Sequence, residues 1–152
     1  MIHVKAPNPI PDLTYPTVFT AGSIEMGTAE PWQDELADYM DGVAVTILNP
    51  RRDAWDDLGP EALHEQITWE LNGIARADIV AFYFDPATKS PVTLLELGLV
   101  LGSKPSRAIV CCPPTFYRYD NVEITCATYG AAVCHTKQAL FSALYRRFER
   151  ND

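Results

Sequence analysis

The sequence predicts an α/β domain, in which a parallel β-sheet of about five strands is covered by helices on both faces. Short apolar segments alternate along the chain with longer segments of helical periodicity. The inner apolar segments carry almost no polar residue on either face, which is typical of strands buried in a parallel sheet. A length of 152 residues is that of one ordinary domain.

Each expected element follows from a local pattern. Residues 1–16 contain four prolines and little periodicity, and we expect an extended N-terminal arm before a domain over 17–152. Five apolar segments of strand length end at turns or polar loops: 17–22, 43–48, 78–84, 107–112 and 131–135. Between them, apolar residues recur at helical spacing in four segments: 29–40, 60–77, 91–101 and 137–150. Prolines at 60 and 91 suit the first turn of a helix, and 122–125 fits either a short helix or a strand.

Composition and charge exclude several classes of function. The chain has 12 basic and 20 acidic residues, a net charge of −8, and so lacks the basic surface that nucleic-acid polymers or anionic membranes require. No apolar run approaches the ~20 residues that span a bilayer, and the proline-rich start lacks a signal-peptide core. The four cysteines form no C-x-x-C pair and lie near no histidine cluster, so we expect buried free thiols in a reducing cytoplasm and no metal site.

The loop after the second expected strand combines charges with an aromatic ring. Ligands of parallel sheets bind beyond the carboxyl ends of the strands, so this loop lies where chemistry is expected. It reads Asn-Pro-Arg-Arg-Asp-Ala-Trp-Asp, and its Arg51, Asp53 and Trp55 could recognise a planar polar ring by hydrogen bonds and stacking. The alternative is a solvated loop held by its own Arg–Asp pairs. Neither a dinucleotide-binding glycine pattern nor a P-loop is present.

One charged residue interrupts an otherwise apolar segment. The helix expected over 91–101 carries Glu96 as its single charge. A helix that is apolar all round is buried, and glutamate is almost never buried without a partner. Glu96 also lies near the helix N-terminus, on the ligand side of the sheet, where the helix dipole favours an anion. We therefore expect a nucleophile or general base, the alternative being a structural glutamate that caps backbone amides.

A second carboxylate is expected on an inward face. On the helix over 60–77, Leu63, Ile67 and Ile74 form an apolar stripe that leaves a place at residue 70. Glu70 should therefore face inward, although a partly exposed helix edge is the alternative. Two carboxylates that share one cleft push their pKa values apart, an arrangement that recurs in acid–base chemistry.

These motifs resemble those of the nucleoside 2-deoxyribosyltransferase family, over roughly residues 17–125. The most specific part is Glu70-Leu-Asn-Gly-Ile, then a strand, then Leu95-Glu96-Leu-Gly98. In the family, an acidic residue opens the first motif and the nucleophilic glutamate lies in the second. The loop with Arg51 and Trp55 is similar to that of the 2-deoxyribosyltransferase-like branch.

The resemblance implies a Rossmann- or flavodoxin-like fold and a covalent exchange reaction. Glu96 would attack C1′ of a 2′-deoxynucleoside, the base would leave, and a second base would take the sugar. Glu70 would tune or orient this chemistry. The residues implied in substrate binding lie in four loops: Gly22, Ser23, Ile24, Arg51, Asp53, Trp55, Ser90 and Asn121. The family pattern implies no metal or organic cofactor, and a homo-oligomer in which Asn121 reaches the neighbouring subunit's site.

Two positions depart from the family pattern. Phe19 stands where some members have a tyrosine that bonds the nucleophile, and Ser90 stands where aspartate is frequent. A serine also occurs near this place in related nucleotide N-glycoside hydrolases, where it helps hold a 5′-phosphate. Three readings therefore stay open: a transferase acting on nucleosides and free nucleobases, a nucleoside or nucleoside-5′-monophosphate hydrolase that uses Glu96, and a non-catalytic nucleotide-binding module.

Overall fold

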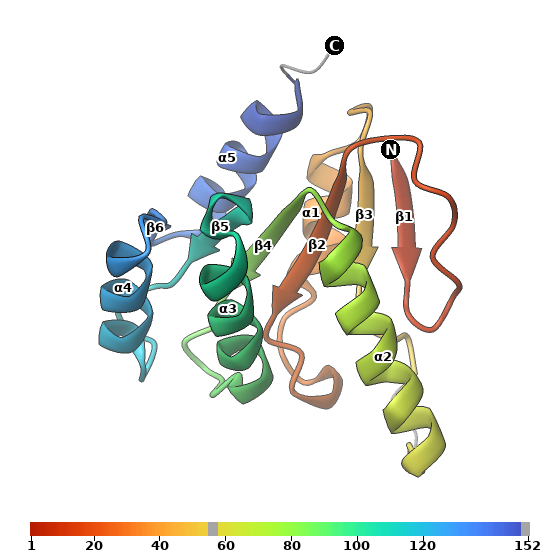
Figure 1. Ribbon diagram of the computed structural model, residues 1–152, viewed down its shortest axis with the longest axis horizontal. Helices are drawn as coiled ribbons and strands as arrows, with labels where there is room; N and C mark the ends of the chain where they lie inside the picture. Colours follow the sequence, from red (N-terminus) through yellow and green to blue (C-terminus); the bar gives the residue numbers. More distant parts are fainter. Residues whose placement is uncertain (55–57, 150–152) are drawn as a thin grey trace.

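The computed structural model describes residues 1–54 and 58–149, which form a six-stranded sheet with every strand parallel to its neighbours (Figure 1). The strands are β1 (Ile2–Lys5), β2 (Thr17–Gly22), β3 (Thr46–Asn49), β4 (Ile79–Tyr83), β5 (Ala108–Cys111) and β6 (Val133–Cys134). Their order across the sheet is β1-β3-β2-β4-β5-β6. The fold class predicted from the sequence is thus confirmed.

The strand order reverses between β2 and β4. From β2 the chain moves to β3 on one side, and it then returns to β4 on the other side. Phe19 of β2 is in register with Leu48 of β3 and with Val80 of β4. Such a switch point leaves a crevice at the carboxyl ends of the two central strands, and this is where ligands bind in open α/β sheets.

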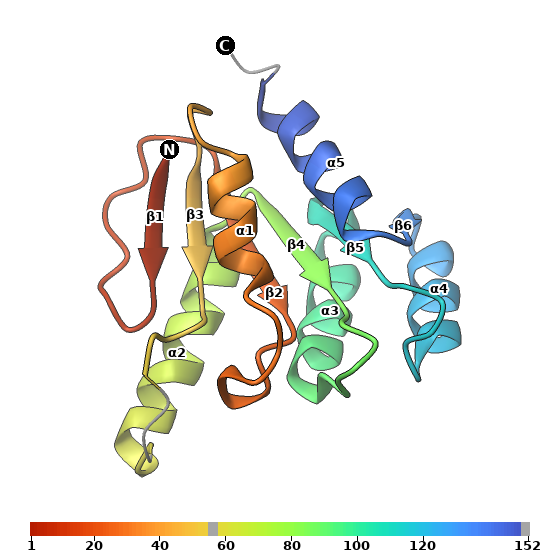
Figure 2. The ribbon, with the colours of Figure 1, turned by 180° about the vertical axis from the view of Figure 1, so that it is seen from behind.

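Five α-helices cover the two faces of the sheet. They are α1 (Trp32–Tyr39), α2 (Pro60–Arg76), α3 (Pro91–Ser103), α4 (Tyr119–Thr128) and α5 (Lys137–Glu149). Helices α2 and α3 cover the face that is in front in Figure 1, and α1 and α5 cover the face that is in front in Figure 2. Buried side chains of α2, α3 and α4 form one core with Phe19 and Phe82, and those of α1 and α5 form the other with Ile47 and Ala81.

A close approach of helix to sheet depends on Gly73. A Cβ at this position of α2 would come within 2.8 Å of the ring of Phe19, which is fully buried on β2. The Phe19 ring also lies against Trp69, with ring centroids 6.2 Å apart. The absence of a side chain at Gly73 therefore sets how closely α2, and with it Glu70, lies to β2.

The N-terminal segment 1–16, predicted as an extended arm, contains a strand of the sheet. Its residues Ile2–Lys5 are the edge strand β1, paired in parallel with β3. Further along, Trp69 Nε1 donates a hydrogen bond to the Asn8 carbonyl at 2.8 Å, which holds the segment against α2. The sequence suggested about five strands because four residues beside prolines are too few to show a strand pattern. The open segment around 122–125 is helical, within α4.

The cysteines lie where β5, β6 and α4 meet. All four are free: Cys111, Cys112 and Cys126 are buried, and Cys134 is partly exposed. No helix among the described residues is long and apolar enough to cross a membrane.

Candidate active site

Glu96 lies in the second turn of α3 and is buried. Only 8% of its surface is exposed, and its Oε2 atom has no hydrogen-bond partner. Burial, followed by the negative charge of Glu70, raises the pKa of Glu96 to about 8. A carboxyl group in this state costs free energy when ionised, and its unpartnered oxygen is free to contact a ligand. The expected burial of Glu96 is therefore borne out.

Glu70 lies on α2, near enough to Glu96 for its negative charge to raise the pKa of Glu96. Burial raises its pKa, while a hydrogen bond from Gln66 and the charge of Arg52 act in the opposite direction. Gln66 Nε2 donates to Glu70 Oε1 at 3.0 Å and to the Pro50 carbonyl at 2.8 Å. Arg52 Nε in turn donates to Gln66 Oε1 at 2.6 Å. Glu70 is thus positioned by a chain of polar contacts that reaches the loop after β3.

The inward face of α2 is not the apolar stripe that the sequence suggested. Leu63 and Ile67 are 49% and 47% exposed, whereas Gln66, Trp69 and Gly73 are buried. Ile74, the third residue of the predicted stripe, is buried as expected, so the stripe was wrong at two of its three positions, and Glu70 is partly buried beside the inward face. Gln66 was missed, and its position four residues before Glu70 on the same helical face is the signal that could have found it.

Three hydroxyl groups meet at the ends of β2 and β4. Ser90 Oγ lies 2.5 Å from Ser23 Oγ and 2.8 Å from Thr88 Oγ1. The Asp85 backbone N–H donates to Ser23 Oγ at 3.0 Å. Ser23 and Ser90, predicted as substrate-binding residues, are therefore adjacent, and Thr88 is a member of the cluster that sequence reasoning missed.

The loop after β2 reaches across to the start of α3. Gly22 ends β2 against the indole of Trp32, where any Cβ would clash at 2.5 Å. The carbonyl of Ile24 accepts hydrogen bonds from the backbone N–H groups of Gly27 and Ala29, which closes the loop into a compact turn. Beyond it, Glu25 Oε1 accepts a hydrogen bond from the Ser90 N–H at 3.1 Å.

In the loop after β3, two residues predicted to bind substrate, Arg51 and Asp53, instead contact other parts of the chain. The Arg51 guanidinium donates to the backbone carbonyls of Gly27, Ala29 and Glu30 at 2.7–3.0 Å. Arg51 therefore fixes the loop that follows β2. Asp53 is exposed and pairs with Lys5 at 2.5 Å. Trp55 lies outside the described residues.

Asn121 is on a different part of the surface from Glu70. It is exposed in the first turn of α4 and borders a groove of about 370 Å³ between α3 and α4. The floor of this groove includes Leu94, Leu97 and Gly98 of α3. The lining of this groove includes neither Glu70 nor Glu96.

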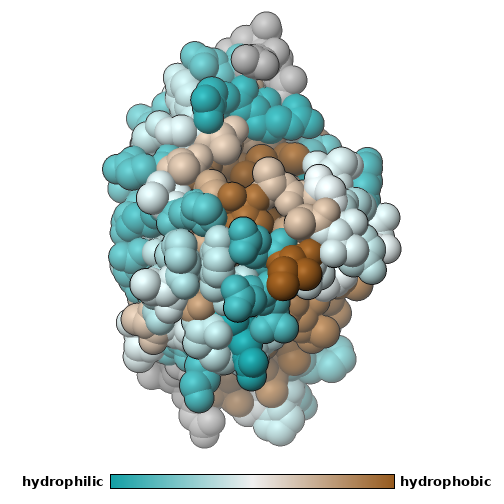
Figure 3. Space-filling model, turned by 90° about the vertical axis from the view of Figure 1, so that its left-hand side faces the viewer, coloured by the Kyte–Doolittle hydropathy of each residue, from teal (hydrophilic) through white to brown (hydrophobic). Residues whose placement is uncertain are grey.

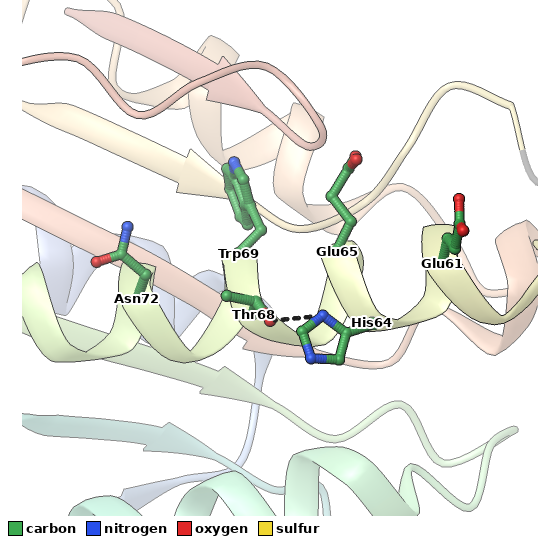
Figure 4. Close-up of a pocket in the computed structure, with 6 residues that line it drawn as sticks. All are labelled: Glu61, His64, Glu65, Thr68, Trp69 and Asn72. Atoms are coloured by element: carbon green, nitrogen blue, oxygen red, sulfur yellow. Dashed lines mark hydrogen bonds between the residues drawn. The ribbon is translucent and has the colours of Figure 1, made fainter.

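A further groove of about 470 Å³ runs along α2 (Figure 4). Its lining residues all come from this helix: Glu61, His64, Glu65, Thr68, Trp69 and Asn72. It contains none of the predicted site residues. Among the described residues, no three His, Cys, Asp or Glu side chains are placed to hold a metal ion.

The fold and the crevice define a class: a parallel α/β protein with two interacting carboxyl groups beside its topological switch point. Residues 15–116, about two thirds of the chain, match the family model described as "Nucleoside 2-deoxyribosyltransferase like". The chain therefore belongs to this family, and the resemblance seen in the sequence is confirmed. No curated protein matches the chain.

Proposed function

We propose that the protein is a nucleoside 2′-deoxyribosyltransferase with Glu96 as its nucleophile. One observation carries this proposal: in a chain of this family, Glu96, which lies in the sequence that resembles the family's nucleophile motif, is buried and has an unpartnered oxygen. Covalent catalysis needs a carboxylate that is shielded from water yet not tied up by other donors. Glu96 meets both requirements.

The reaction has two displacement steps. A Glu96 carboxylate oxygen bonds to C1′ of the nucleoside as the bond between C1′ and the base nitrogen breaks, and the base leaves with a proton. A second base then bonds to C1′ through its ring nitrogen, loses its proton, and releases the Glu96 carboxylate. Both steps pass through an oxocarbenium-like transition state, which the negative charge of the crevice stabilises.

Glu70 acts on this chemistry through the shared proton. Because the charges of Glu70 and Glu96 repel, the first proton leaves the pair more readily than the second. Over an intermediate pH range the pair therefore holds one proton. In that range the proton resides mainly on Glu96, whose pKa is raised to about 8, so Glu96 attacks as the anion only once this proton has left.

The proposed enzyme is a homo-oligomer whose subunits cover the crevice. Apolar side chains of the two neighbouring helices are 47–73% exposed in the single chain, at Leu63, Ile67 and Leu71 of α2 and at Val92, Leu95 and Leu99 of α3. Ile124 of α4 is 65% exposed, and Figure 3 shows apolar surface at the centre of the side that carries α4 and β6. Exposed apolar faces of this extent mark interaction sites, and a second copy would bring its Asn121 to the crevice.

The direct test is incubation with 2′-deoxyinosine and free adenine, followed by chromatography of bases and nucleosides. We expect new 2′-deoxyadenosine from the unaltered protein and a loss of at least about 10³-fold in Glu96→Ala and Glu96→Gln. Glu61→Gln, which changes an exposed glutamate in the first turn of α2, is the matched control and should retain activity. Hypoxanthine without 2′-deoxyadenosine would favour the hydrolase, and ligand binding without any product would favour the binding module.

A further inference from the structure

The start of α3 is occupied by a carboxylate of the chain itself. Helix α3 has 13 residues, and its dipole favours negative charge at the N-terminus. In many α/β proteins a phosphate binds at such a helix start beside the switch point. Here Glu25 extends its carboxylate to this place and accepts the hydrogen bond from the Ser90 N–H at 3.1 Å.

Backbone strain is concentrated at the two residues that form this contact. Glu25 has φ 48° and Ser90 has φ 47°, and they are the non-glycine residues with positive φ in the described parts of the chain. A side chain makes this left-handed conformation costly, by about 1 kcal/mol or more. Two strained residues that bond to each other indicate a contact that the surrounding structure maintains.

The hydroxyl groups near this helix start also have partners within the chain. The hydroxyl groups of Ser23, Thr88 and Ser90 contact one another at 2.5–2.8 Å. The Asp85 N–H donates to Ser23 Oγ, and the Ala87 N–H donates to the Asp85 carboxylate at 2.9 Å. A phosphate would therefore have to displace contacts that the chain already makes.

Charge in the two loops also opposes a phosphate. Segments 23–30 and 85–90 contain three acidic residues, Glu25, Glu30 and Asp85, and one basic residue, Lys89. The guanidinium of the nearby Arg51 donates its hydrogen bonds to backbone carbonyls, and Lys137 pairs with Glu30 and Glu35. The loops thus present a net negative surface to the ligand.

The start of α3 lies within reach of a substrate bound at the proposed nucleophile, Glu96. Ser90 precedes Glu96 by six residues, a rise of about 9 Å along a helix. The span of a nucleoside monophosphate from its anomeric carbon to its phosphorus is shorter than this rise, but helical side chains point toward the helix N-terminus, which brings the Glu96 carboxylate closer to Ser90. A 5′-phosphate on a sugar held at Glu96 can therefore reach the place that the Glu25 carboxylate occupies.

We propose that Glu25 is a specificity-determining residue that restricts the site to nucleosides without a 5′-phosphate. Its carboxylate takes the Ser90 N–H and repels a phosphate from the start of α3. The inference rests on the proposed function and deepens it, because it selects the uncharged nucleoside over the nucleoside monophosphate as substrate. Glu25 discriminates by contact and charge, and it takes no part in bond breaking.

The test compares kcat/KM for 2′-deoxyadenosine and for its 5′-monophosphate, each with free hypoxanthine as acceptor. The unaltered protein should prefer the nucleoside by at least about 100-fold, close to 3 kcal/mol of discrimination. Glu25→Gln keeps an oxygen acceptor for the Ser90 N–H but removes the charge. It should lower the ratio of kcat/KM for the nucleoside to kcat/KM for the monophosphate at least tenfold. Inorganic phosphate should inhibit Glu25→Gln more strongly than the unaltered protein. Glu149→Gln removes the same charge at the far end of α5 and should leave the ratio unchanged.

Two results would overturn the inference while leaving the transferase intact: equal or better use of the monophosphate by the unaltered protein, or an unchanged ratio in Glu25→Gln. If neither substrate reacts, the proposed function fails. Calorimetric measurement of the binding of the nucleoside and of the monophosphate then tests the role of Glu25 by itself. Tighter binding of the nucleoside, with the difference reduced in Glu25→Gln, would support the role of Glu25. Tighter binding of the monophosphate, or no binding of either ligand, would refute it.

Discussion

Glu96 must lose a proton before it can attack C1′, so its pKa sets the pH dependence of the proposed reaction. Burial and the charge of Glu70 raise that pKa to about 8. We therefore expect kcat/KM, which reports the free enzyme, to rise with pH up to a midpoint near 8. Replacing Glu70 by Gln removes one of the two causes, and the midpoint should move to lower pH. The measurement is a pH–rate profile of both proteins, with Glu61→Gln as control. A midpoint between pH 4 and 5, or an unmoved midpoint in Glu70→Gln, would contradict this account.

The same carboxyl group links stability to pH. The folded chain binds the Glu96 proton more tightly than the unfolded chain, in which the pKa returns to its ordinary value of 4.5. The stabilisation of the folded chain by protonated Glu96 is therefore fully present below pH 4.5. It is lost as the pH rises to about 8, because Glu96 then ionises in a buried site.

Glu96→Gln removes this loss, since glutamine does not titrate. Relative to the unaltered protein, the variant should gain free energy of unfolding between pH 5 and pH 9, by up to the order of 4 kcal/mol. Urea unfolding at several pH values measures the difference. A constant difference across this range would mean that Glu96 titrates in the folded chain as it does in water.

At the scale of elements, the distance at which α2 packs on the sheet depends on one glycine. Alanine inside a helix normally stabilises it by up to about 1 kcal/mol relative to glycine. At Gly73, however, the added methyl group would meet the buried ring of Phe19 at 2.8 Å. We expect Gly73→Ala to destabilise the fold by about 1–3 kcal/mol and to lower activity by shifting Glu70.

Gly102→Ala provides the control, because nothing lies within 4 Å of a Cβ at that position of α3. It should be neutral or slightly stabilising in the same thermal unfolding measurement. Equal effects at Gly73 and Gly102 would show that α2 can move away from β2 without cost.

The elements also show what a single sequence can predict. The buried strands β2 and β4 and the proline-led helices α2 and α3 were predicted because each carries a strong local signal. Strand β1 was missed because its pairing with β3 is not encoded in its own four residues. Glu96 could be singled out because a lone charge in an apolar helix is visible locally. The contact between Glu25 and Ser90 joins residues 65 positions apart, and no local pattern reports it.

The direction in which an amphipathic helix faces is settled only by the whole molecule. Leu63 and Ile67 have the spacing of core residues, yet they are exposed in the single chain because Gln66, Trp69 and Gly73 face the sheet. Apolar periodicity on α2 therefore predicts burial without telling which partner buries it. The proposed partner of the exposed side chains of α2 and α3 is a second subunit, because apolar faces of this extent mark interaction sites.

This assignment can be tested at Leu95, which is 73% exposed on α3 and one residue from the proposed nucleophile. Leu95→Asp should leave the fold of the single chain intact but break the oligomer, because a charge would be buried at the subunit contact. Its sedimentation velocity should report a smaller species than the unaltered protein, and its activity should fall at least tenfold through loss of the covering subunit. Tyr15→Asp places the same charge at an exposed position near the amino ends of the strands and should change neither property. If Leu95→Asp sediments as the unaltered protein does, the exposed face of α3 is not the contact. If it dissociates and keeps its activity, each subunit holds a complete site, and Asn121 has no role in the neighbour's crevice.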